Sequence, residues 1–144
     1  PTPQGTKDNT VYFFKINDRP IGSPQRKSYY DTENDQMVHE EIQVIETTFQ
    51  INTLVKQNPS SLTITASDLC NMVNQILQSA DCINTLANSN IGIYRVTEVR
   101  NPYFDSFDNN YEANPSFDFT ITHNSTILKN VGTISTYDYT IKGV

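Results

Sequence analysis

The sequence is poor in several residue types and patterns, and each shortage excludes a class of protein. Two cysteines, Cys70 and Cys82, are too few for a disulfide-built scaffold, so we expect two reduced thiols that act as small, mostly buried apolar side chains. The five glycines form no phosphate-binding loop. No run of about 18 apolar residues is present, so no membrane-spanning helix is predicted. No charged-then-apolar leader resembles a secretory signal.

Positive charge is also scarce. The chain has 10 Lys and Arg against 16 Asp and Glu, a net charge of −6, which argues against gripping a nucleic-acid duplex through its phosphates. Hydrophobic residues make up 36% and charged residues 18%, so much of the surface is uncharged and polar. The 144 residues fit one domain, 1–144, with 1–10 as an extended N-terminal arm. Because the chain begins at Pro1 and not at Met, we expect residues to be missing upstream.

Apolar residues recur at helical spacing only between Thr65 and Ala87. Thr65 is placed to cap the first turn, with Asp68 reaching back as in a capping box. Ser79 and Asp81 should interrupt the helix and start a second short one, which ends at residues 88–90. The predicted buried stripe is Leu69, Met72, Val73, Ile76 and Leu77, followed by Cys82, Ile83 and Leu86.

The N-terminal half of the chain is typical of strands. Val11–Ile16 is apolar at consecutive positions, which predicts a strand covered on both faces, by the helix on one side and a neighbouring subunit on the other. A turn is expected at residues 17–20. Residues 23–31 and 36–55 should form a long hairpin around the turn 32–35. In its second strand one face carries Ile45, Thr47, Phe49 and Ile51. The other face, with Val44, Glu46, Thr48 and Gln50, should be wet or lie at an interface.

Three further strands are expected after the helical region. In residues 91–100 apolar and polar residues alternate only weakly. In residues 116–122 the alternation is clear and predicts that Phe117, Phe119 and Ile121 point to the core. Residues 133–142 predict a thinly covered final strand that pairs with a neighbour or a tail protein. The fold class is α/β (α+β): a mixed, mostly antiparallel sheet with a long hairpin and one main helix on one face.

Candidate chemistry is sparse. His39 lacks the second histidine of a zinc-protease motif, and His123 is the only other imidazole. The acidic loop with Asp105, Asp108, Asn109 and Glu112 breaks the calcium-loop pattern. No nucleophile pattern is present, so we predict no enzyme, no cofactor and no metal. Arg19, Arg26 and Lys27 lie near Tyr29 and Tyr30 in the sequence. Such a combination of basic and aromatic residues could stack on bases or sugars, but it favours a protein interface, where these residue types are enriched.

Several separated segments resemble the bacteriophage neck or tail terminator family, over nearly the whole chain up to His123. None of them is a catalytic motif, and the helical segment with which members usually begin further upstream is absent. The matching segments are residues 1–6, 14–23 with Arg19 and Gly22, 46–50 (ETTFQ), 65–69 (TASDL), 95–104 (RVTEVRNPYF) and 115–119 (PSFDF).

The resemblance implies a structural subunit of a homo-oligomeric, hexameric ring in the virion neck at the top of the tail, assembled in the host bacterial cytoplasm. Such a ring caps the tail tube, stops its polymerisation and joins it to the head-completion or connector protein, with a sheath protein as a further partner. Genome DNA would only pass through the lumen, and no membrane is involved. The interface residues expected are Tyr12, Phe14, Arg19, Tyr29, Tyr30, Asn101, Tyr103, Phe104, Phe107, Tyr137 and Tyr139.

Three other functions stay open at this point. The Tyr-rich and Asn/Thr-rich strands would also suit a monomeric carbohydrate- or peptide-binding module. A head-completion or connector ring would share the same resemblance. A hydrolase that uses the carboxylates of Asp105, Asp108 or Glu112 is the third alternative.

Overall fold

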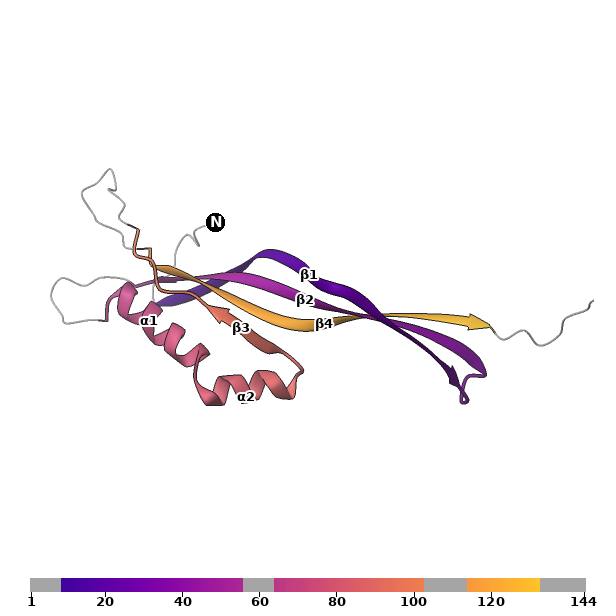
Figure 1. The fold of residues 1–144 in the computed structure, drawn as a ribbon. Coiled ribbons are helices and arrows are strands. Elements are labelled where there is room, and N and C mark those ends of the chain that lie inside the picture. Colours follow the sequence, from indigo (N-terminus) through magenta and orange to yellow (C-terminus); the bar gives the residue numbers. More distant parts are fainter. Residues whose placement is uncertain (1–8, 56–63, 103–113, 133–144) are drawn as a thin grey trace, which may run out of the picture.

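The computed structural model describes residues 9–55, 64–102 and 114–132. These residues form one four-stranded sheet in the order β1-β2-β4-β3, and every neighbouring pair in it is antiparallel. The predicted fold class is therefore confirmed, with two helices beside the sheet (Figure 1). The elements are β1 (Thr10–Asp31), β2 (Gln36–Leu54), α1 (Ala66–Leu77), α2 (Ala80–Asn88), β3 (Gly92–Val96) and β4 (Ser116–Gly132).

Both helix starts follow from local side chains. The Thr65 hydroxyl accepts a hydrogen bond from the Asp68 amide at 3.1 Å, and the Asp68 carboxylate accepts one from the Thr65 amide at 3.1 Å. This capping box confirms the predicted start of α1. Ser79 accepts from the Cys82 amide at 3.3 Å and caps α2, so the predicted interruption is confirmed as well.

The core lies between the helices and one face of the sheet. Ile51, Cys70, Phe117 and Phe119 form its buried centre, and Phe117 is fully buried. The Thr53 hydroxyl donates to the Ala66 carbonyl at 2.7 Å and ties β2 to the first turn of α1. These contacts confirm the inward direction of Phe117 and Phe119 that their alternation predicts.

The buried stripe of α1 is rotated from the predicted one. Cys70 lies at its centre, with Val73 and Leu77 packed beside it, whereas Met72 and Ile76 are 48% and 55% exposed. The prediction that Met72 and Ile76 are buried is wrong, because α1 packs on the sheet through the side that carries Ala66, Cys70, Val73 and Leu77, and this orientation turns Met72 and Ile76 away from the sheet. Both cysteines are free thiols, as expected. Burial raises the pKa of the Cys70 thiol, and a hydrogen bond with Thr53 opposes this rise.

The predicted turn at residues 17–20 is wrong, since β1 runs unbroken from Thr10 to Asp31. Pro20 and Pro24 are tolerated because β1 is the edge strand, where the outer side of the backbone needs no hydrogen-bond donor. The register shifts twice, between Lys15 and Asn17 and between Ile21 and Gln25. On the helix side the predicted cover of this strand is wrong at Phe13, which is 71% exposed. Phe14 points to the other face and is 42% exposed, and its cover by a neighbouring subunit stays a prediction.

The other strand boundaries differ in length. The hairpin around residues 32–35 is confirmed, but β4 continues ten residues beyond the predicted end at Thr122, to Gly132. The predicted strand 91–100 is shorter, with β3 ending at Val96 and an isolated bridge joining Arg100 to Ser116. The expected final strand 133–142 lies outside the described residues. Within the described part of the chain, no helix is long and apolar enough to span a bilayer.

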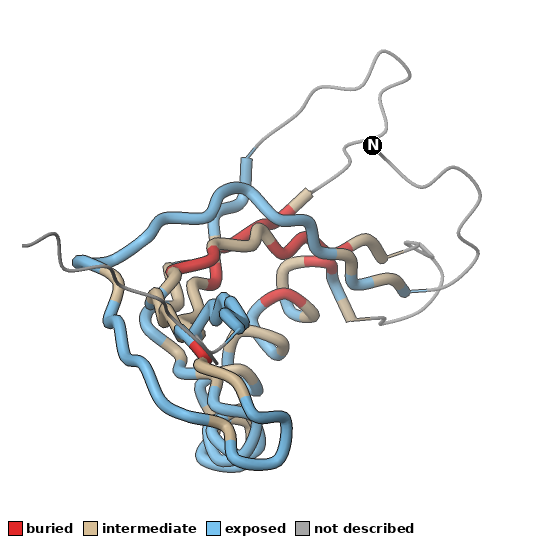
Figure 2. Tube along the Cα trace, turned by 90° about the vertical axis from the view of Figure 1, so that its right-hand side faces the viewer, coloured by how far each residue is buried: buried red, intermediate tan, exposed pale blue. Residues whose placement is uncertain are grey.

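The long strands divide the molecule into two regions (Figure 1). We call "base" the helices, β3 and the strand segments 10–19, 46–54 and 116–122. We call "arm" the segments 21–31, 36–45 and 123–132, where β1, β2 and β4 continue past the helices. In Figure 2 the buried residues gather in the base; in the arm Val38 alone is buried.

Candidate assembly surface

The face of the sheet turned away from the helices, here the "open face", carries four of the predicted interface residues. Residues opposite one another on antiparallel strands share a face. Phe13 is opposite the core residue Ile51, so Tyr12, opposite Asn52, points the other way. Phe14 opposite Gln50, Arg19 opposite Glu46 and Tyr29 opposite Val38 follow on the same open face.

The first irregularity of β1 produces this alignment, and the second, between Ile21 and Gln25, leaves the odd-numbered residues on the same face. Lys15 is opposite Phe49 on the helix side, but one extra residue, Ile16, places Asn17 opposite Thr48. Odd-numbered residues of β1 therefore change from the helix face to the open face after Ile16. Sequence spacing alone would put Phe14 and Arg19 on opposite faces, whereas the bulge brings them to the same one.

Ion pairs join β1 and β2 on the open face. Arg19 donates from Nε and Nη2 to Glu46 Oε2 at 3.0 and 2.7 Å, and the side chain of Glu46 is only 9% exposed. The prediction for this face of β2 is that it is wet or lies at an interface. At Glu46 it is not wet, because the carboxylate is covered and paired with Arg19, and the interface stays a prediction. In the arm, Lys27 contacts Glu40 at 2.7 Å on the same face. Both pairs link β1 to β2 across the open face.

Exposed apolar residues accompany the charges on the open face of the arm. Ile21 and Val44 face each other, and Leu128 lies opposite Glu40. On the other face of the arm Ile127 is 65% exposed and lies opposite Glu41. A single-layer sheet with apolar side chains exposed on both faces lacks a second layer to bury them. The arm is therefore suited to contact other chains.

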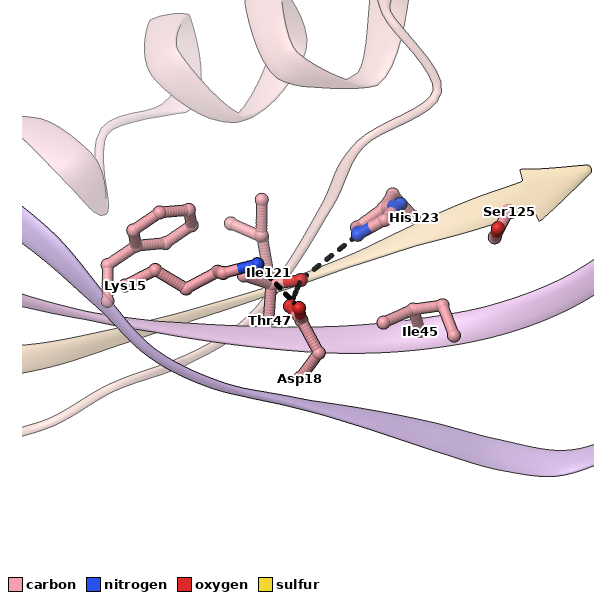
Figure 3. A pocket seen from close by; sticks show the side chains of 8 residues that line it. Lys15, Asp18, Ile45, Thr47, Ile121, His123 and Ser125 are labelled. Atoms are coloured by element: carbon pink, nitrogen blue, oxygen red, sulfur yellow. Dashed lines mark hydrogen bonds and ion pairs between the residues drawn. The ribbon is translucent and has the colours of Figure 1, made fainter.

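A hollow of about 440 Å³, lined by both polar and apolar side chains, lies on the helix side near the junction of base and arm (Figure 3). Asp18 accepts hydrogen bonds from Lys15 Nζ at 2.6 Å and from the Thr47 hydroxyl at 2.7 Å. His123 Nε2 lies 3.0 Å from the same hydroxyl. Both hydrogen bonds lower the pKa of the Asp18 carboxyl, and the one from Lys15 has the larger effect.

The direction of these hydrogen bonds does not suit nucleophilic catalysis. Thr47 has one hydroxyl proton and gives it to Asp18, so His123 must donate from Nε2 to the Thr47 oxygen. A histidine in this role is not a base for Thr47. Among the described residues no group of three or more His, Cys, Asp or Glu side chains could hold a metal ion.

The remaining predicted interface residues fall elsewhere or are not described. Tyr30 points to the face opposite Tyr29 and donates a hydrogen bond to Asp35 in the hairpin turn. Asn101 is exposed just after the Arg100–Ser116 bridge. Tyr103, Phe104, Phe107, Tyr137 and Tyr139 lie outside the described residues, as do the acidic residues Asp105, Asp108, Asn109 and Glu112 of the predicted loop.

Sequence reasoning missed the apolar residues of the distal half of β4. Ile127 and Leu128 are consecutive in the run Asn124–Gly132, which was not expected to be a strand. The sequence signal for this strand is an apolar pair flanked by polar residues that favour β-structure. Such a short pair does not predict a strand by itself, and it is explained by the pairing of β4 with β2. Ile83 on α2 is 44% exposed, so its predicted place in the buried stripe is wrong, as it is for Met72 and Ile76 on α1.

A family model described as "E217 gateway protein gp29" matches residues 1–133. No curated protein matches the chain.

Proposed function

The chain belongs to the family of the E217 gateway protein gp29, a family of phage structural proteins, and we propose on this basis that it is a subunit of a ring in the phage neck. The family makes it a virion component that contacts other virion proteins. In the proposal the subunit forms a homo-oligomeric ring, hexameric as the sequence resemblance implies. The ring acts as a tail terminator that caps the tail tube and joins the tail to the head connector.

The observation that carries the proposal is the incomplete arm. Its three strands leave apolar side chains exposed on both faces, with Leu128 59% exposed on one and Ile127 65% on the other. Two or three strands in one layer are marginal unless another layer or another chain covers them. A monomeric binding module would be expected to bury these residues itself. A subunit that completes its arm in an assembly would expose them only before assembly.

Charge supports the passage of DNA through the ring without tight binding. The net charge of −6 favours repulsion of phosphates. In the arm the basic side chains Arg26 and Lys27 are paired with Glu41 and Glu40 at 2.7 Å, so they are neutralised within the chain. A lumen built from such a surface would let the genome slide.

The deciding experiment is negative-stain microscopy of lysates from a phage that lacks this gene. A tail terminator predicts tailless heads together with overlong or disordered tubes, and a plasmid copy of the gene should restore normal tails. Tails of normal length that fail to join heads would instead indicate that the protein belongs to a head-completion ring. Intact infectious particles would contradict any role in the neck.

The ring itself is tested on the purified chain by light scattering coupled to size-exclusion chromatography. We expect one closed species with a mass that is a fixed multiple of 16.3 kDa. A concentration-independent monomer that binds glycans would favour the carbohydrate-binding module instead.

A further inference from the structure

The outer edge of β4 is open along the arm. β3 pairs with β4 only through Phe119–Thr122. Beyond that point, from His123 to Gly132, no described strand lies on this side of β4, while β2 pairs with its inner side throughout. Backbone N–H and C=O groups along such an edge form a template for another strand.

The two edges of the arm differ in how well they are protected from pairing. The β1 edge is interrupted by Pro20, Pro24 and the register shift between Ile21 and Gln25, all of which hinder strand addition. The β4 edge has no proline, and its register with β2 is continuous to Gly132. Ile127 and Leu128 are exposed on it. These features make the β4 edge the better of the two for pairing with an added strand.

We propose that the β4 edge of the arm pairs with residues Gln25–Asp31 of β1 in a second copy of this chain. This segment lies beyond the last irregularity of β1 and is the longest regular stretch of that edge within the arm. β1 and β4 are both antiparallel to β2, so the two edges run in the same direction and would form a parallel pair. The pairing rests on the proposed function, because it names the contact between ring subunits.

The side chains on the two edges are compatible. At one level across β2 lie Lys27, Glu40 and Leu128, and at the next lie Tyr29, Val38 and Asn130. The exposed Leu128 of one copy would thus meet the alkyl chain of Lys27 or the ring of Tyr29 in the next. The acids Glu40 and Glu41 stay in the central strand, so no acidic side chains oppose each other across the new pair.

Repetition of this contact gives a closed assembly. The β4 edge and the β1 edge are different surfaces, so each copy uses one to accept and the other to donate. Such a head-to-tail contact generates a ring when the rotation closes. It also covers the edge that leaves the arm prone to uncontrolled pairing.

Disulfide trapping tests the pairing directly. Tyr29→Cys combined with Asn130→Cys, in a Cys82→Ser background, places two thiols about 10 Å apart within one chain, too far to bridge. Adjacent strands of two copies lie about 5 Å apart, so oxidation should give a ladder of covalent multimers up to the ring. Single-cysteine variants should give dimers at most. Pairing Tyr29→Cys with a cysteine at residue 128 or 132 in place of residue 130 tests a register shifted by two residues in either direction.

A charge variant tests the same edge without cysteines. In Ile127→Lys/Leu128→Lys the new amines face Glu41 and Glu40 of their own chain, so folding should be retained. They would meet Arg26 and Lys27 of the next copy, and we expect ring assembly to weaken about ten-fold or more. The matched control Asn84→Lys/Asn88→Lys adds the same charge on exposed positions of α2 and should assemble normally.

The outcomes separate this pairing from the ring proposal. Rings that form in the double-lysine variant as readily as in the unmodified chain, or rings that yield no cross-linked ladder, would overturn the β4–β1 contact and leave the ring intact. An unmodified chain that stays monomeric at every concentration would overturn both.

Discussion

The base and the arm are made from the same three strands, yet only the base has a core. In the base, Ile51 and Phe117 pack under α1 and are almost completely buried. In the arm, Ile127 and Val131 lie on the same face of the sheet as these core residues and are 65% and 37% exposed. The difference lies in the layer above the sheet and not in the strands. Apolar residues along one strand can therefore serve stability at one end and assembly at the other.

The largest effect should come from removing a side chain from the core of the base. Phe117→Ala leaves a cavity under α1 and should lower the free energy of unfolding by about 3–5 kcal/mol. Ile127→Ala in the arm should change it by less than about 0.5 kcal/mol in the unassembled chain. Urea denaturation followed by circular dichroism measures both. Equal losses would mean that the arm has its own core.

The ion pairs give a second, smaller contrast. Glu46→Gln removes the charged acceptor of two Arg19 hydrogen bonds at a covered position, and we expect a loss of about 1.5 kcal/mol. Glu41→Gln breaks the exposed Arg26 pair in the arm and should cost about 0–0.5 kcal/mol. Denaturation midpoints of the two variants should rank in this order, and the reverse order would show that the arm pairs dominate.

Gly22 tests the irregularity that begins the arm. Its φ of +66° is left-handed, so Gly22→Ala should destabilise the chain by about 1 kcal/mol even though an added Cβ meets nothing within 4 Å. Gly132→Ala is the control, because an added Cβ is equally free there and no positive φ is involved. A neutral Gly22→Ala would indicate that β1 relaxes at this point without strain.

The smallest effect concerns pH at the junction of base and arm. The hydrogen bond from Lys15, followed by that from Thr47, lowers the pKa of Asp18 below its ordinary value of 3.8. Its stabilising contribution is therefore present above pH 3.8 and is lost as the pH falls through the lowered pKa. In the Asp18→Asn variant, the free energy of unfolding should therefore fall less steeply at acid pH than it does in the unmodified chain.

Lys15→Met serves as the partner variant in that measurement. It should flatten the acid limb in part, and adding it to Asp18→Asn should change little, because the two groups act through one contact. A curve for Asp18→Asn with the same acid slope as the unmodified chain would contradict the assignment.

The misses share a physical cause. Val11–Ile16 was expected to end in a turn because Asn17, Asp18 and Pro20 favour one, yet β1 continues as an edge strand in which proline costs no pairing. Met72 and Ile76 are apolar at helical spacing, but α1 turns a different side, with Cys70, to the sheet and leaves them exposed. The length of a strand and the side of a helix that is buried depend on neighbours far away in the sequence.

What the sequence by itself determined is local: the capping of α1 by Thr65, the break at Ser79, the hairpin turn at residues 32–35 and the inward alternation of Phe117 and Phe119. Each depends on side chains within a few residues of one another, so short-range hydrogen bonding and periodicity suffice. Only the tertiary structure decided that β4 follows β2 to Gly132 and that the bulge at Ile16 aligns Phe14 with Arg19 on the open face. Strand register is set by pairing between distant segments, and therefore so is the surface offered to other chains.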